Sequence, residues 1–442
     1  FHATGRGCNS LDSVVRAPQE PRALSIYPPH TFDAPERLDA VRTAVSTLDA
    51  THAESERRAH ASSLLTPVLR RLDPRDRGPV AQRFMGLLRH HRRVSFALGR
   101  HEHDHDARSL APEVLDGTLP VDEALDILPD VPWARVAGWR EQLPRDPRVA
   151  FAIEYSLPTW VALRWQDDPS LAAAMLEAPP TTIRTNTLRV GRDALAVRLA
   201  DRSPRPAPLT SQGLILERPG ALWNTEAFAE GLFEAQDAGS QLIAELVAPP
   251  PGGRVLDACA GAGGKTLALA AIMGGKGRII ATDTAHEKLD ALRDRARRAG
   301  ATNVQVVTHE VTGTFDRILV DAPCTGSGTW RRNPEAKLHG DAHAVAELAA
   351  LQLQIAAQVV PLLAPGGRLV YATCSLFPEE NQGVVAALCA RFPELAPVRI
   401  AEIHGKAWAE PLVDDTGCAI ALRPDRHGTD GFYAAVLRKP RG

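Results

Sequence analysis

Past Gln236 the sequence alternates between short strand-like apolar runs and longer helical stretches. Such an alternation builds a mostly parallel sheet covered by helices, so it predicts a doubly wound α/β domain over residues 236–442. The predicted strands are Arg254–Ala258, Arg278–Thr282, Val304–Val307, Arg317–Val320 and Arg368–Thr373, with one or two closing strands in 418–423 and 431–438. The predicted helices are Lys265–Met273, Glu287–Ala299, Val345–Leu363 and Glu380–Arg391.

A glycine-rich turn, Asp257–Thr266, follows the first predicted strand. Glycines there let the backbone approach a ligand and point the next helix N-terminus at it. The end of this turn resembles a phosphate-binding P-loop, but the first glycine which that motif requires is replaced by Cys259. Asp283 ends the second strand and suits a ribose diol, a combination that fits NAD and S-adenosylmethionine equally well. Glu310, after the third strand, is a candidate for contact with an adenine amino group.

Two cysteines lie at the ends of neighbouring predicted strands. The fourth strand leads into Asp321–Gly328, which contains Cys324, and the fifth leads into Cys374. Ligands of open α/β sheets bind beyond the carboxyl ends of the strands, so both thiols and Asp321 are predicted to share one crevice. The spacing does not decide which thiol reacts. Cys389 and Cys418 are interpreted instead as small buried apolar side chains.

The chain before Gln236 has two different patterns. Residues 32–145 are predicted to form a helical domain, because apolar residues such as Val41 and Val45 recur at helical spacing, and Asp76 is expected to cap a helix after Pro74. Residues 150–235 are predicted to be a small α+β domain with strands at Ile183–Leu188 and Leu214–Leu216. Residues 1–31 are expected to be a disordered leader.

Composition restricts the class of protein. The net charge is only −2 with a pI near 6.8, so any nucleic-acid contact must come from a local patch. No apolar run reaches the ~18–20 residues of a membrane span, and six cysteines without a secretory signal predict a cytoplasmic protein. The segment His101–Asp106 alternates its side chains to opposite sides, and we predict that the chain holds no metal.

Taken together, the motifs resemble the RsmB/Sun family of S-adenosylmethionine-dependent RNA cytosine-C5 methyltransferases. The matching segments are Asp257–Thr266, Asp321–Gly328, Arg331–Pro334, Pro365–Gly367, Thr373–Ser375 and Glu379–Asn381, with Asp430–Phe432, Gln236–Asp237 and Arg184–Thr187. Upstream, Leu72–Arg77 and Leu87–Arg89 are similar to the NusB-like RNA-binding domain of bacterial ribosomal members. Gly261–Ala262 stands where the family has Ala-Pro, and Glu310 replaces its adenine-contacting aspartate.

The resemblance implies a Rossmann-like class I methyltransferase in which Cys374 is the nucleophile, Cys324 assists product release and Asp321 assists the addition. It implies that an unpaired cytosine of ribosomal RNA is the substrate, and the helical N-terminal domain favours the small subunit. A transfer-RNA or large-subunit enzyme, or a non-catalytic ribosome-assembly factor, is the alternative. We expect a monomer. The implied cofactor contacts are Cys259, Ala260, Gly261, Ala262, Gly263, Gly264, Lys265, Asp283, Glu310 and Asp321, and the implied RNA contacts are Arg331, Arg332, Arg89, Arg92 and Arg93.

Overall fold

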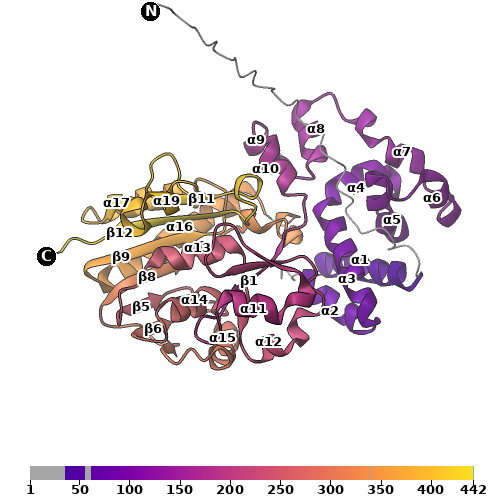
Figure 1. Ribbon diagram of the computed structural model, residues 1–442. Helices are drawn as coiled ribbons and strands as arrows, with labels where there is room; N and C mark the ends of the chain where they lie inside the picture. Colours follow the sequence, from indigo (N-terminus) through magenta and orange to yellow (C-terminus); the bar gives the residue numbers. More distant parts are fainter. Residues whose placement is uncertain (1–34, 55–60, 339, 442) are drawn as a thin grey trace, which may run out of the picture.

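The computed structural model describes residues 35–54, 61–338 and 340–441 (Figure 1). The chain runs from a group of helices, drawn in indigo and purple, through a small sheet to a large sheet drawn in orange and yellow. The predicted leader, residues 1–31, lies outside the described residues.

The N-terminal part is helical and has a core of its own. Val41 and Val45 are buried against Phe84 and Leu88, which bears out the helical periodicity. Asp73 rather than Asp76 caps the helix after Pro74, because its carboxylate accepts from the Arg75 amide at 2.9 Å. The helices are α1 Pro35–Glu54, α2 Ala61–Arg70, α3 Pro74–Arg89, α4 His91–Leu98, α5 His105–Asp116, α6 Val121–Ile127, α7 Trp133–Ala137, α8 Pro147–Glu154, α9 Thr159–Trp165 and α10 Pro169–Ala174.

A small antiparallel sheet follows, with the strand order β2-β3-β1-β4. Its strand β3 (Gly213–Leu216) matches the second predicted strand, whereas β1 (Thr181–Thr185) covers only the first half of the first, because the chain turns after Thr185. The short strands β2 (Pro204–Pro206) and β4 (Phe233–Ala235) escaped prediction, because three residues are too few to show an alternating pattern. Helices α11 (Arg192–Arg198) and α12 (Glu226–Ala229) accompany the sheet.

The large sheet confirms the predicted α/β class. Its order is β10-β12-β9-β8-β5-β6-β7, with β11 paired to β12, and β5 to β9 are mutually parallel while the closing strands are antiparallel. The strands are β5 Arg254–Asp257, β6 Arg278–Ala281, β7 Val304–Val306, β8 Phe315–Asp321, β9 Leu363–Thr373, β10 Ala396–Pro397, β11 Ala419–Leu422 and β12 Phe432–Arg438. The main helices are α13 Ala238–Val247, α14 Gly264–Ile272, α15 His286–Ala299, α16 Ala342–Val359 and α17 Gln382–Arg391.

Two apolar clusters fill the faces of this sheet, one around Leu242 and Ile279 and the other around Ile318 and Leu388. The stretch Ala342–Leu362, which contains α16, is long and apolar enough to cross a membrane by length and composition alone. Helix α16 packs on α17 and β8, and its Gln352 is fully buried beside the site described below. We therefore describe α16 as one of the helices that cover the sheet.

Candidate active site

Three adjacent strands end at one edge of the large sheet and deliver the polar residues that the sequence singled out. The chain order reverses between β5 and β8, which is the point where open α/β sheets bind ligands. Asp257 ends β5, Asp321 ends β8, and Cys374 follows β9 directly. The predicted convergence of these residues is a consequence of the sheet order.

The turn between β5 and α14 is shaped by two glycines. Gly261 has φ +50°, and a Cβ placed on it would meet no atom within 4 Å, so its face towards the pocket is open. Gly263 has φ +89°, and a Cβ there would lie 2.1 Å from Leu292 of α15. The first position admits a ligand and the second admits only glycine, because a side chain would collide with the next helix.

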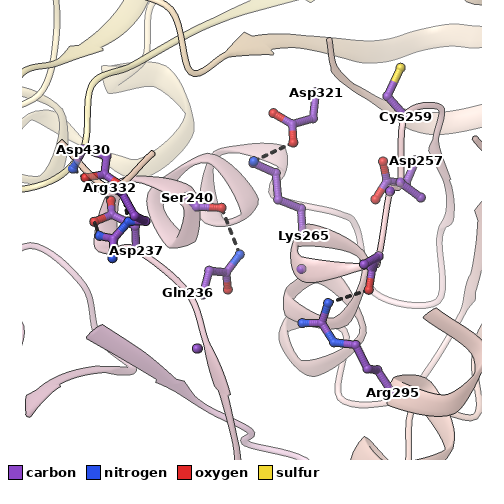
Figure 2. Close-up of a pocket in the computed structure, with 15 residues that line it drawn as sticks. Gln236, Asp237, Ser240, Asp257, Cys259, Lys265, Arg295, Asp321, Arg332 and Asp430 are labelled. Atoms are coloured by element: carbon purple, nitrogen blue, oxygen red, sulfur yellow. Dashed lines mark hydrogen bonds and ion pairs between the residues drawn. The ribbon is translucent and has the colours of Figure 1, made fainter. Parts of the chain in front are cut away.

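Charged residues surround the pocket behind this turn (Figure 2). Asp257 is fully buried; its Oδ2 accepts from Thr266 Oγ1 at 2.7 Å, and its Oδ1 has no hydrogen-bond partner among the described residues. Burial and the nearby Asp321 raise the pKa of Asp257 to about 7. Lys265 Nζ lies 2.7 Å from Asp321 Oδ2. Burial alone would lower the pKa of Lys265, but the Asp321 carboxylate outweighs it and the pKa is raised.

The pocket has a volume of about 380 Å³. Figure 2 shows Asp237, Arg332 and Asp430 together on one side of it, with Lys265 and Asp257 towards another. Its wall includes most of the residues predicted to contact a cofactor: Cys259, Ala260, Gly261, Ala262, Gly264, Lys265 and Asp321.

Three predicted cofactor residues do not line this pocket. Gly263 is turned into the contact with α15. Asp283 lies behind the glycine turn, where its carboxylate accepts from the amides of Gly261 and Ala285, each at 2.8 Å. Glu310 is exposed in the loop after β7. The structure thus gives Asp283 a role in holding the turn, and it places Glu310 off the wall of the pocket.

The two predicted thiols lie side by side. Cys324 Sγ and Cys374 Sγ are 3.4 Å apart, and both side chains are half-buried. The hydrogen bond to Cys374, burial and the charge of Glu380 raise the pKa of Cys324 well above its usual value. The pKa of Cys259 is also raised, by burial and by the surrounding aspartates. Cys259 and Cys324 are therefore held in the protonated form.

A buried hydrogen-bond network supports the thiol pair. Glu380 is fully buried and accepts from the backbone amide of Thr325 at 2.9 Å and from Gln352 Nε2 at 2.9 Å. Its second carboxylate oxygen accepts from Thr325 Oγ1 at 2.6 Å and from Ser375 Oγ. The two loops that carry the cysteines are thereby joined through one side chain.

The five arginines predicted to contact RNA are all engaged within the protein. Arg331 is 3% exposed and its Nε lies 2.9 Å from Asp430 Oδ1. Arg332 pairs with Asp430 at 2.8 Å and with Asp237 at 3.3 Å, and its side chain keeps 36% exposure at the pocket. Of the five, Arg332 is the one that lines the pocket.

The other three arginines, on α3 and α4, each donate a hydrogen bond within the protein, and their contact with RNA stays a prediction. Arg89 is buried and donates to the backbone oxygen of Arg331 at 3.2 Å. Arg92 donates to the Leu157 oxygen at 2.6 Å, and Arg93 donates to the Glu154 oxygen. Arg89 lies at a junction between the helical part and the segment that follows β8, whereas Arg92 and Arg93 join α4 to α8 and to the loop after it. Sequence periodicity alone did not reveal this junction.

Several residues of the site carried no signal of their own in the sequence. Arg295 of α15 donates to the Ala262 oxygen at 2.6 Å and pairs with Glu234, so it fixes the glycine turn. Gln352 is the one polar residue among the buried residues of α16, but the same helix carries further glutamines, so the sequence did not distinguish it. Among the described residues, no group of His, Cys, Asp and Glu is arranged to hold a metal ion.

Comparison with known proteins supports this description. Residues 244–438 match the family described as 16S rRNA methyltransferase RsmB/F. A Bacillus subtilis (strain 168) protein named probable ribosomal RNA small subunit methyltransferase B is 32% identical over 310 residues, which are 66% of this chain and 69% of that protein. A methyltransferase homologue from Pyrococcus horikoshii is 30% identical with a TM-score of 0.57, covering 67% of this chain and 100% of that one.

The crystal structure of PH0851 is 21% identical with a TM-score of 0.73, and it covers 92% of this chain and 99% of that one. At this identity the likeness concerns the fold, and it extends from the helical part to the large sheet. The chain belongs to the RsmB/F family of methyltransferases.

Proposed function

We propose that this protein transfers a methyl group from S-adenosylmethionine to C5 of a cytosine in ribosomal RNA, with Cys374 as the covalent nucleophile. The observation that carries the proposal is the pair of thiols 3.4 Å apart, at the strand end next to the Lys265–Asp321 ion pair. One thiol is enough for a Cys-dependent addition. A second thiol in contact with it suits a cycle that must also release the product.

The residues around the pocket fit S-adenosylmethionine. The unpartnered Oδ1 of buried Asp257 is an acceptor suited to an ammonium group, and the open face of Gly261 leaves room for a ligand against the backbone. Asp283 is fixed behind the same turn and suits a ribose diol. When bound, S-adenosylmethionine supplies a methyl group on a positively charged sulfur.

The protein's task is to make C5 of the cytosine nucleophilic. Thiolate attack by Cys374 on C6 forms an S–C6 bond and places electron density on C5, which then takes the methyl group. The ammonium of Lys265, which is paired with Asp321, also interacts electrostatically with Cys374. Asp321, held by Lys265, is suited to hydrogen bonding at N3 and N4 of the base. Loss of the C5 proton to a base then breaks the C6–S bond and returns the thiolate.

Cys324 is proposed to assist the release step. Its thiol contacts Cys374, and its raised pKa keeps a proton within reach of the sulfur that must leave. DNA cytosine methyltransferases use the cysteine of a Pro-Cys motif, which here is Cys324. That alternative assignment predicts the opposite behaviour of the two cysteine variants.

The substrate proposal rests on the relatives. The Bacillus subtilis relative is named for the small ribosomal subunit, so small-subunit ribosomal RNA is our first substrate. Transfer RNA and large-subunit RNA are the alternatives of the same chemistry, and a non-catalytic assembly factor is the alternative of another class. The presence of both thiols and an intact glycine turn favours catalysis.

Release of tritium from RNA labelled at C5 of cytosine tests the proposal. Unmodified small-subunit RNA, large-subunit RNA and transfer RNA, each carrying this label, would be incubated with the protein and S-adenosylmethionine. We expect tritium release that depends on the cofactor and is fastest with small-subunit RNA. Methyl transfer without tritium release would contradict C5 chemistry, and no transfer to any of the three RNAs would favour the assembly factor.

A further inference from the structure

Glu380 is a fully buried carboxylate whose surroundings are neutral. Its carboxylate accepts four hydrogen bonds, from one amide N–H, one carboxamide and two hydroxyls. None of these four donors is a lysine or an arginine. A buried carboxylate normally has a cationic partner, whereas this one is held by neutral hydrogen-bond donors, an unusual arrangement that points to a specific use.

The network is built to connect the two cysteine loops. Thr325 follows Cys324 in the sequence, and Ser375 follows Cys374, so the carboxylate binds the next neighbour of each thiol. Tyr371 of β9 supports it from behind by donating its hydroxyl to the Glu380 backbone oxygen at 2.5 Å. A change at Glu380 is therefore transmitted to the loops of both thiols.

Asn381 holds the same loop from the other side. Its Oδ1 accepts from Thr373 Oγ1 at 2.5 Å, and its Nδ2 donates to the Ser375 oxygen at 2.9 Å. The segment Glu380–Asn381 thus forms hydrogen bonds with the residues on both sides of Cys374.

The charges around the two thiols are unequal. Cys324 is influenced by the negative charge of Glu380, whereas Cys374 interacts with the positive charge of Lys265. The titratable groups that face the pair are Cys324 and Cys374 themselves, Glu380, the hydroxyl of Tyr371, and Lys265, whose charge is paired with Asp321 at 2.7 Å. A negative charge disfavours a thiolate and a positive charge favours it. This difference in neighbouring charge distinguishes the two thiols, although they contact each other.

We propose that Glu380 is a positioning residue that fixes the two cysteine loops against each other and places a negative charge beside Cys324, so that Cys374 is the thiol that reacts. This inference rests on the proposed function for its consequence in catalysis. The difference in reactivity between the two thiols is a property of the free protein, without RNA or cofactor.

The variant Glu380→Gln separates charge from position. The glutamine oxygen can take the place of Oε1, which accepts from the Thr325 amide and from Gln352. Its NH₂ group can take the place of Oε2 and donate to the two hydroxyls, which can rotate to accept. The hydrogen bonds are therefore retained while the charge is lost. Glu379→Gln is the matched control, because Glu379 is a neighbouring, 46% exposed carboxylate that pairs with Arg164.

Alkylation with iodoacetamide over a range of pH, followed by peptide mapping, measures the reactivity of each thiol without RNA or cofactor. In the wild type and in Glu379→Gln we expect Cys374 to be modified well before Cys324. In Glu380→Gln we expect modification of Cys324 to rise about tenfold, the effect of a pKa lowered by about one unit. An unchanged preference in a Glu380→Gln protein with wild-type thermal unfolding would overturn the proposal.

A second background removes competition between the thiols. In Cys374→Ala, the pH midpoint for alkylation of Cys324 should fall by about one unit when Glu380→Gln is added, and it should stay unchanged when Glu379→Gln is added. Equal midpoints in all three proteins would contradict the role of the charge. Because alkylation needs no methyl transfer, its failure leaves the proposed function standing, and a failed tritium release leaves this result standing.

Discussion

The buried ion pair between Arg331 and Asp430 provides a quantitative test of how the site is held together. Asp430 is 1% exposed and lies 2.9 Å from the Nε of Arg331, which is itself 3% exposed. Asp430→Ala leaves the Arg331 guanidinium buried, with a hydrogen bond to the Gly428 oxygen in place of a carboxylate, whereas Arg332 loses Asp430 but keeps Asp237 as a carboxylate partner. Removing one partner of a buried pair costs about 3–5 kcal/mol, because the remaining charge is not compensated.

For a unit of roughly 200 residues, each kcal/mol corresponds to about 2–4 °C, so the expected decrease in Tm is about 6–20 °C. The control is Glu230→Ala, which removes an ion pair with Arg198 whose side chains are 43% and 48% exposed. An exposed pair contributes about 0–1 kcal/mol, and the expected decrease is below about 4 °C.

Thermal unfolding followed by tryptophan fluorescence suits the measurement, because Trp330 is buried one residue before Arg331. Adding Arg331→Met to Asp430→Ala removes the stranded charge and should restore part of the lost Tm. The reasoning is refuted if Asp430→Ala lowers the Tm no more than Glu230→Ala does, or if the double variant is less stable than Asp430→Ala.

Three further predictions follow from groups at the site and at the junction. The pKa of Asp257 is about 7, and a bound cation favours its ionised form. The affinity for S-adenosylmethionine, measured by calorimetry, should therefore fall by up to about tenfold per pH unit below about pH 7. In Asp257→Asn this decrease should be less steep. Burial lowers the pKa of Lys337 to about 7 in the folded protein. Above about pH 7 the unfolded chain therefore binds more protons than the folded protein does. The free energy of unfolding should therefore rise between about pH 7 and pH 10, by at most about 1.4 kcal/mol per pH unit. Thermal unfolding at several pH values should show this rise in the wild type and not in Lys337→Met. Arg92→Met should lower the Tm yet leave the salt dependence of RNA affinity unchanged, since Arg92 binds Leu157; a reduced slope would restore its RNA role.

Local sequence patterns predicted the α/β domain well, because each buried strand and each amphipathic helix shows its own periodicity. The strands β5 and β9 lie where the apolar runs indicated, and the rule for strand ends predicted that Asp321, Cys324 and Cys374 converge at one edge of the sheet. It did not single out Asp257, which lies at the same edge. The glycine turn was equally visible, because positive φ angles need glycine at Gly261 and Gly263.

What the sequence did not show depends on contacts between distant segments. Arg89 and Arg331 look like solvated charges in sequence. In the structure the Arg89 guanidinium donates to the backbone oxygen of Arg331 at 3.2 Å, although 242 positions separate the two residues. The rule for strand ends predicted that the two cysteine loops converge, but it did not indicate that the carboxylate of Glu380 joins them. The division into domains and the NusB-like character of the N-terminal helices stay predictions.

Which cysteine attacks the cytosine is the central claim, and trapping of the protein–RNA adduct tests it most directly. Cys374→Ala and Cys324→Ala would each be incubated with small-subunit RNA and labelled S-adenosylmethionine, then separated under denaturing conditions. The account predicts no methyl transfer and no adduct for Cys374→Ala, and a stable labelled protein–RNA adduct for Cys324→Ala, which attacks normally but releases product slowly. An active Cys374→Ala protein, or an adduct formed through Cys324, would contradict it.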